Sequence, residues 1–246
     1  MSDATSVTPF KYRAFISYSH ADRAWGDWLH KALEAYRVPS KLVGMPTASA
    51  GPVPKRLFPI FRDREELPTS ADLGGQITAA LAASQFLIVI ASPRSAASRW
   101  VNEEVRAFKR LGRESRILPI IVDGEPNAAG KPGWDPASDC FCPALKFSLR
   151  PDGQLGDAPF EPICADARPQ GDGKGNALLK LVAGLLNVGF DALRQRDAEA
   201  RRRRIVLRSA LAAVALAALF GGGTWLALSQ RHAAEDRSAA LARLSS

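Results

Sequence analysis

Two adjacent carboxylates, Glu103 and Glu104, lie in a short segment whose apolar residues recur at helical spacing, and their neighbours differ. Glu103 has Arg99 four residues before it and Arg106 three residues after it, so we expect a solvated residue that forms ion pairs. The helical neighbours of Glu104 are all apolar: Trp100, Val101, Ala107 and Phe108. A buried acid without a cationic neighbour is costly, which makes Glu104 a candidate functional residue. The helix macrodipole also favours a glutamate near a helix N-terminus, so this segment alone leaves both interpretations open.

The spacing around these acids predicts the helix that must carry them. Ser98 is of a residue type preferred at an N-cap. Val101, Val105 and Phe108 then recur at positions that place them on one buried face. The apolar β-formers at 86–90 come before this helix and predict a buried strand. The sequence therefore places both acids on a helix that follows a strand and packs on the core.

The residues that usually bind metals are few. The chain holds three cysteines and three histidines, namely Cys140, Cys142, Cys164, His20, His30 and His232. Their spacing provides neither a zinc motif nor a disulfide framework. We therefore expect no metal and no resident cofactor. The N-terminal residues lack the apolar core of a signal peptide, so we expect the main domain to lie in a reducing cytoplasm.

The net charge of +8 is distributed unevenly along the chain. Arginines crowd into residues 194–208, and no aromatic residue is interleaved with them. A nucleic-acid-binding surface combines basic residues with aromatics along a groove. The pattern therefore favours a membrane surface as the partner of this segment and argues against nucleic acid.

Strand patterns and helix patterns alternate along the first two thirds of the chain. Continuous apolar runs predict strands at 13–18, 57–61, 86–91 and 117–122, with a short edge strand at 145–149. Amphipathic helices are predicted between them, and a last helix is predicted at 176–193. Runs that are apolar throughout are typical of a parallel sheet covered on both faces. The fold class is therefore α/β.

The sequence changes character after residue 193. Residues 194–208 read as a basic helical stalk, and residues 209–230 carry no charge. As a helix this uncharged segment is about 33 Å long, enough to cross a bilayer. Because the arginines precede it, the positive-inside rule keeps the N-terminal domain cytoplasmic. Residues 231–246 would form a short tail outside.

Four motifs in order resemble the Toll/interleukin receptor (TIR) domain family. They are FISYSHAD at 15–22, FRDREEL at 61–67, IASP at 90–93 and SRWVNEEV at 98–105. The resemblance covers residues 11–193 and extends to bacterial TIR proteins that carry a membrane helix after the domain. It implies a flavodoxin-like fold with a five-stranded parallel sheet flanked by helices. Residues 1–10 are left as a disordered N-terminus.

The resemblance also assigns roles residue by residue. The family's catalytic glutamate lies four residues after a tryptophan, which matches Glu104 and Trp100 and favours the functional interpretation of this acid. The substrate-binding positions of the family fall on Tyr18, Ser19, Phe61, Arg62, Asp63 and Trp100. Some NAD-cleaving members have basic residues where this chain has Ser19 and His20, and Arg62 is then the expected source of positive charge. The loop at 62–75 matches the one through which TIR domains self-associate.

The resemblance implies a membrane-anchored NAD+ nucleosidase that cleaves the nicotinamide–ribose bond in signalling or defence. NAD is then a substrate, and the expected location is the bacterial inner membrane, with a single span. One alternative is a scaffold without catalysis that acts through contacts between TIR domains. A second is a sensor whose tail or span reports on the cell envelope. The enzyme is favoured because a pure adaptor has no need of an acid at Glu104.

Overall fold

The computed structural model describes residues 10–47, 51–62, 73–160 and 162–244. Within helix α7 (Phe190–Leu244) the side chains are described up to Ala218, apart from residues 201 and 204, and at Trp225. The predicted disordered N-terminus at 1–10 thus lies outside the described residues except for its last position. Most of the predicted assembly loop at 62–75 lies outside them too. The chain forms two compact units, Met1–Arg194 and Gln195–Ser246.

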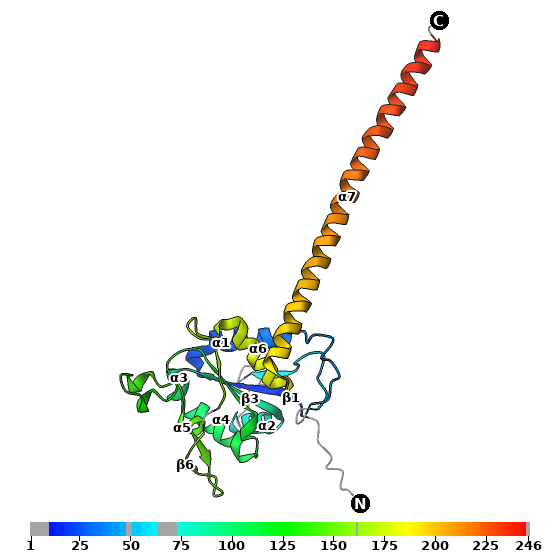
Figure 1. Ribbon diagram of the computed structural model, residues 1–246. Helices are drawn as coiled ribbons and strands as arrows, with labels where there is room; N and C mark the ends of the chain where they lie inside the picture. Colours follow the sequence, from blue (N-terminus) through cyan, green and yellow to red (C-terminus); the bar gives the residue numbers. More distant parts are fainter. Residues whose placement is uncertain (1–9, 48–50, 63–72, 161, 245–246) are drawn as a thin grey trace, which may run out of the picture. The chain divides into compact units, whose positions relative to one another are not determined.

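A five-stranded parallel sheet organises the first unit, as the sequence predicts (Figure 1). Its strands are β1 (Tyr12–Ser17), β2 (Ile60–Arg62), β3 (Ser84–Ala91), β4 (Ile117–Ile121) and β7 (Ala165–Asp166). Their order across the sheet is β2-β1-β3-β4-β7. Strand β1, which lies between β2 and β3, aligns Phe15 with Phe61 on one side and with Leu87 on the other. All five strands end at the same edge, because all the pairings are parallel.

Helices cover both faces of this sheet. One face packs against α1 (Arg23–Ala35) and α6 (Gly173–Leu186). The other packs against α2 (Leu73–Ala82), α4 (Arg99–Arg110) and α5 (Pro143–Lys146). The remaining short helices are η1 (His20–Asp22), α3 (Pro93–Ala96), η3 (Glu114–Arg116), η4 (Ala128–Gly130) and η5 (Pro136–Ser138). The continuous apolar runs of β1 and β3 follow from this burial on both faces.

Several predicted elements are wrong in detail. The strand expected at 57–61 begins only at Ile60, as β2. The edge strand expected at 145–149 is instead the end of α5 followed by β5 (Phe147–Leu149), which pairs with β6 (Leu155–Pro159) in a separate antiparallel sheet. The fifth strand of the main sheet is β7, which has only two residues and therefore leaves almost no apolar run in the sequence. Pro143 begins α5 at a first-turn position, where proline is tolerated.

The helix predicted at 176–193 is also two helices. α6 ends at Leu186 because Asn187 adopts a left-handed conformation with φ of 53°. The Asn187 N–H bonds back to the carbonyls of α6, and asparagine is one of the few residues that adopt this conformation readily. α7 then begins at Phe190 and runs through the predicted stalk, span and tail.

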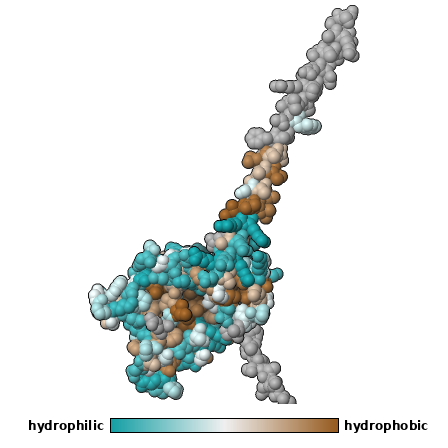
Figure 2. Space-filling model, viewed as in Figure 1, coloured by the Kyte–Doolittle hydropathy of each residue, from teal (hydrophilic) through white to brown (hydrophobic). Residues whose placement is uncertain are grey.

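The basic and apolar segments of α7 are distinct in Figure 2. Exposed apolar side chains follow the arginines, and they include Ile205, Val206, Leu207, Leu211, Val214 and Leu216. In the described part of the chain no single helix has the length and apolar composition of a membrane span. Only α6 taken together with residues 190–218, as a bent pair, meets that description. Most side chains of the second half of the predicted span, 219–230, lie outside the described residues.

The three cysteines differ in burial, and this predicts their reactivity. Burial raises the pKa of the Cys140 thiol to about 12 and that of Cys142 to about 11, whereas Cys164 is half-buried. A thiol reacts as its thiolate, so at pH 8 the two buried cysteines should react at least about a hundredfold more slowly than an ordinary thiol. Mass spectrometry after brief treatment with maleimide should find the label on Cys164. Labelling of Cys140 or Cys142 at a similar rate would contradict the burial.

Candidate active site

A hydrogen bond joins the carboxyl end of β1 to α4. Ser17 Oγ donates to Glu104 Oε2 at 2.5 Å. Ser17 is fully buried and Glu104 is half-buried. α4 is held in place by its N-cap Ser98, whose hydroxyl accepts a hydrogen bond from the Val101 N–H. The carboxylate therefore lies at the edge of the sheet where the parallel strands end, which is the usual place for a ligand in such folds.

The alternation of side chains along β1 explains this contact. Phe15 belongs to the core on the α4 face, and Ile16 belongs to the core on the α1 face. Successive side chains of a strand point to opposite faces. Ser17 therefore points to the same face as Phe15 and meets α4 at the end of the strand.

Glu103 is placed as the sequence predicts. Its carboxylate forms an ion pair with Arg106 at 3.0 Å, and its side chain is 44% exposed. The two adjacent acids thus differ in their contacts, since one meets a surface cation and the other a buried hydroxyl. A carboxylate fixed by an internal hydroxyl at a sheet edge is the better candidate for binding or catalysis.

Trp100 lies in the first turn of α4. Its side chain is 58% exposed, whereas Val101 and Phe108 are buried. The buried face of α4 beside Glu104 is therefore formed by aliphatic residues and Phe108. The indole of Trp100 lies at the surface. An exposed tryptophan near a carboxylate is suited to stacking on a planar ligand or on a partner protein.

Tyr18 and Ser19 follow Ser17 in the loop after β1. The Tyr18 ring is buried in the core on the α1 face and packs on Gly26, where an added Cβ would lie 3.1 Å from the ring. Ser19 is half-buried and precedes η1. The structure thus places Tyr18 on the face of the sheet opposite Glu104. Contact of Tyr18 or Ser19 with a substrate stays a prediction.

The predicted residues at the end of β2 divide between the two faces. Phe61 is buried on the α4 face, and its ring centroid lies 5.0 Å from that of Phe15. Arg62 points to α1 and forms an ion pair with Asp27. Asp63 lies outside the described residues. Phe61 therefore packs beside Phe15 of β1 on the α4 face. The guanidinium of Arg62 is held by Asp27 of α1.

A buried ionic cluster lies beside this site, and the sequence analysis did not find it. The Asp22 carboxylate is inaccessible to solvent and accepts hydrogen bonds from Ser92 Oγ at 2.5 Å and from Arg94 Nε at 2.8 Å. Arg94 also forms an ion pair with Asp123 at 3.2 Å. The bond to Asp22 raises the pKa of Arg94. The cluster ties together the loops that follow β1, β3 and β4.

A second ionic cluster occupies the ends of β4 and β7. Arg168 forms ion pairs with Asp166 at 2.7 Å and with Glu125 at 3.3 Å. The hydrogen bond from Arg168 lowers the pKa of Asp166, and a bond from Lys131 lowers that of Glu125. Close packing accompanies this cluster, because a Cβ on Gly171 would lie 2.2 Å from the Asp166 side chain. These acids are held by cations, so the cluster has a structural role at the ends of the two strands.

Ser17 and Asp22 are the functional candidates that the sequence analysis missed. Ser17 occupies a strand position where every neighbour is apolar or aromatic, which is a recognisable signal for a buried polar contact. Asp22 has the residue type of a helix N-cap, but its side chain makes no capping bond and is used by the ionic cluster instead. Among the described residues, no group of three histidine, cysteine or acidic side chains has the geometry to hold a metal ion.

Comparison with known proteins identifies the class of protein that this fold and site define. Residues 14–139 match the family model of the TIR domain, so the chain belongs to the TIR domain family. It is similar to the NAD(+) hydrolase ApTIR of Actinoplanes sp., with 33% identity over 115 residues. That match covers 47% of this chain and 14% of the relative, so the chain spans only a small part of the relative's length.

A solved structure is also similar to part of the chain. It contains the TIR domains of the activated Roq1 resistosome, which directly recognises the pathogen effector XopQ. The match has 22% identity and a TM-score of 0.34, and it covers 47% of this chain and 60% of the other.

The ionic cluster at Asp22 predicts a measurable loss of stability. Arg94→Gln leaves a buried carboxylate with one partner fewer, which should lower the free energy of unfolding by about 1–3 kcal/mol. The lower half of that range is expected, because Arg94 is 46% exposed and solvent compensates part of the loss. Urea unfolding followed by circular dichroism measures the change.

Arg110→Gln is the matched control, because Arg110 lies exposed at the end of α4. It should change the free energy of unfolding by less than about 0.5 kcal/mol. Equal effects of the two substitutions would mean that the cluster does not stabilise the loops.

Proposed function

We propose that this chain is a TIR-domain NAD+ nucleosidase in which Glu104 is the catalytic carboxylate. The observation that carries the proposal is the hydrogen bond from buried Ser17 to Glu104 at the edge where the strands end. The similarity to an NAD(+) hydrolase over 115 residues supports the same assignment. The enzyme would be a hydrolase of N-glycosyl compounds, acting in signalling or defence.

The bond that breaks joins C1′ of the ribose to the pyridinium nitrogen of nicotinamide. Its electron pair moves to the ring nitrogen, so nicotinamide leaves as a neutral molecule and needs no general acid. The ribose passes through a transition state that resembles an oxocarbenium ion. Water then adds to C1′ and loses a proton, which yields ADP-ribose. One carboxylate near the ribose is sufficient to stabilise the developing positive charge.

Each residue of the site has a distinct task in this proposal. Glu104 stabilises the ribosyl cation, and Ser17 fixes the rotamer of its carboxylate by donating a hydrogen bond. Trp100 offers an exposed indole for stacking against a ring of NAD. The predicted contacts of Tyr18, Ser19, Phe61, Arg62 and Asp63 with NAD belong to the proposal as well. Burial of Tyr18 and Phe61 favours a supporting role beneath the substrate.

A TIR scaffold without catalysis is the second candidate function. The exposed side chain of Trp100 favours it, because large exposed aromatic side chains are enriched where proteins bind one another. The loop at 62–75 would then mediate assembly with other TIR domains. Self-association is compatible with both functions, and the small residues Ala213, Ala217 and Gly221 offer a second contact along α7.

The difference between the two acids yields the main test. Glu104→Gln should lower NAD cleavage at least about a hundredfold while leaving the urea midpoint nearly unchanged, because it removes the negative charge and keeps the shape. Nicotinamide release by the purified full chain is the measurement.

Glu103→Gln is the matched control and should retain most of the activity, since this carboxylate is 44% exposed and pairs with Arg106 at the surface. Ser17→Ala should give an intermediate loss by freeing the carboxylate to rotate. Equal activity of all three variants and the native chain would reject Glu104 as the catalytic group. Absence of nicotinamide release by the native chain, at the densities reached on a membrane, would favour the scaffold.

We also propose that α7 anchors the domain in the bacterial inner membrane with the domain on the cytoplasmic side. The proposal rests on the arginines at 194–208 and on the uncharged segment 209–230 that follows them. The exposed apolar side chains of Leu211, Val214 and Leu216 are consistent with a lipid environment.

The orientation predicts which part of the chain a protease can reach. Protease added to intact spheroplasts should leave the TIR domain whole and remove only residues after 230. Lysed spheroplasts are the control, in which the domain should be cleaved. Cleavage of the domain in intact spheroplasts would reverse the proposed topology, and recovery of the full chain in the soluble fraction would reject the anchor.

A further inference from the structure

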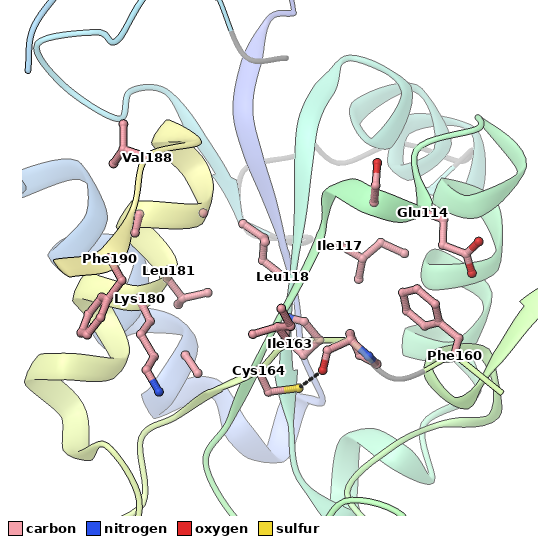
Figure 3. Close-up of a pocket in the computed structure, with 16 residues that line it drawn as sticks. Glu114, Ile117, Leu118, Phe160, Ile163, Cys164, Lys180, Leu181, Val188 and Phe190 are labelled. Carbon is pink, nitrogen blue, oxygen red and sulfur yellow. Dashed lines mark hydrogen bonds between the residues drawn. The ribbon is translucent and has the colours of Figure 1, made fainter. Parts of the chain in front are cut away.

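A cavity of about 540 Å³ opens beside the first half of β4. Figure 3 shows Leu181 and Phe190 on one side of it, Ile117 and Phe160 on the other, and Leu118 between them. An apolar hollow is also visible in Figure 2 between the positions of α6 and α4. The volume is within the range of small-ligand sites. The cavity lies at the start of β4, so it is distinct from the candidate active site at the end of β1.

The shortness of β7 explains why this space is open. β7 pairs only with Ile120 and Ile121, so the part of β4 before them has no β7 residue beside it. Ile121 directs its carbonyl to β7, where it accepts a bond from the Ala167 N–H. Pro119 lies two residues earlier, therefore faces the same side, and has no N–H to donate. This edge is thus poorly suited to pairing with a peptide strand and better suited to an apolar molecule.

The two charged residues of the cavity wall are neutralised by their own partners. Glu114 binds Lys109 at 2.6 Å, and Lys180 binds Asp172 at 2.5 Å. The rest of the wall is aliphatic, aromatic or proline, apart from Ser115 and the Cys164 thiol. The part of a ligand that fills this cavity must therefore be uncharged and apolar.

A second cavity of about 680 Å³ adjoins the first and has the opposite character. Ser115, Leu118 and Gly184 line both cavities, so the two meet along this wall. The second is lined by Arg113 and Arg116, whose guanidinium carbons lie 4.6 and 5.7 Å from the ring centroid of Phe10. An apolar compartment thus lies against a cationic one.

The charged side chains that line the second cavity are those of Arg113 and Arg116. Arg113 donates hydrogen bonds to the carbonyls of Ala82 and Ser84, which are neutral acceptors. Burial and then repulsion by Arg116 lower the pKa of Arg113. The same two causes, in the same order, lower the pKa of Arg13 to about 10. Guanidinium groups that repel one another are stabilised when an anion binds between them.

We propose that the two adjacent cavities together bind a single-chain lipid anion, with the acyl chain beside β4 and the anionic head at Arg113 and Arg116. The apolar cavity would accommodate one acyl chain, and the arginines select a carboxylate or phosphate head. This site is independent of the proposed NAD chemistry, because it lies at the other end of the sheet.

Cys164 provides a direct measurement, because it lines the apolar cavity and is the most accessible of the three thiols. Its Sγ lies 3.2 Å from the Pro162 carbonyl, inside the view of Figure 3. The probes are palmitate, lysophosphatidate, uncharged hexadecanol and inorganic phosphate. The protein is the full chain, held in phosphatidylcholine nanodiscs if extraction needs detergent. Palmitate or lysophosphatidate should slow maleimide labelling of Cys164 at least fivefold, and phosphate alone should not.

Two pairs of variants separate the head from the chain. Arg116→Gln should weaken protection by the anions at least fivefold and leave any weak protection by hexadecanol unchanged, whereas Arg37→Gln, at an exposed site after α1, should have no effect. Ile163→Asp puts a charge at the mouth of the apolar cavity, where the native side chain is 95% exposed, and should weaken every acyl probe. Met45→Asp is its control at an exposed site elsewhere.

Every outcome of this experiment is informative. Protection by palmitate alone or by lysophosphatidate alone supports the proposal and identifies the head as carboxylate or phosphate. Equal protection by hexadecanol and by the anions, with no effect of Arg116→Gln, would overturn the role of the arginines. Unchanged labelling with all four probes would overturn the site itself. Protection by phosphate alone would show an anion site without an acyl chain and would also overturn the proposal.

Discussion

Burial of strand β1 on both faces is the constraint on which the rest of this structure depends. Ala14, Phe15 and Ile16 have no solvent exposure, so neither face of β1 can turn to water. The alternation of side chains is then fixed, and a shift by one residue would exchange the two cores. Ser17 is the last residue of the strand, so this alternation determines the face of the sheet to which its side chain points. The candidate active site is therefore a consequence of packing several residues earlier in the chain.

The polar residues at the end of the sheet are arranged so that most charges are compensated locally. Asp22 shares a buried cluster with Ser92 and Arg94, and Asp166 lies against Arg168. These clusters hold the loops that follow the strands. Such loops must be rigid if the proposed catalytic carboxylate is to keep a fixed position beside a ribose. Glu104 accepts a hydrogen bond from the buried Ser17 hydroxyl, which orients its carboxylate.

Much of the fold could be predicted from the sequence, because long apolar runs and helical spacing report burial directly. The strands β1, β3 and β4 and the helix of Glu104 were found in this way, whereas the strand expected at 57–61 begins only at Ile60. β7 could not be found, because two residues are too few to show an apolar pattern. The break after α6 could not be found either, because it depends on the conformation of a single asparagine. For the site, the contrast between Glu103 and Glu104 could be predicted from their neighbours in the sequence. The contacts of Asp22 and Arg62 join residues 35–72 positions apart, so they could be found only in the tertiary structure.

The position of β1 in the sheet has a consequence for synthesis of the chain. β1 is made first, but its neighbours are β2 and β3, and β3 ends at Ala91. At typical translation rates, about 4–15 s separate the appearance of Ser17 from that of the last residue of β3. Until Arg62 is made the apolar strand has neither neighbour, and until Ala91 is made it has only β2. Lys11 and Arg13 precede its apolar residues and Asp22 and Arg23 follow them, so charges flank the strand on both sides and discourage aggregation of the nascent chain.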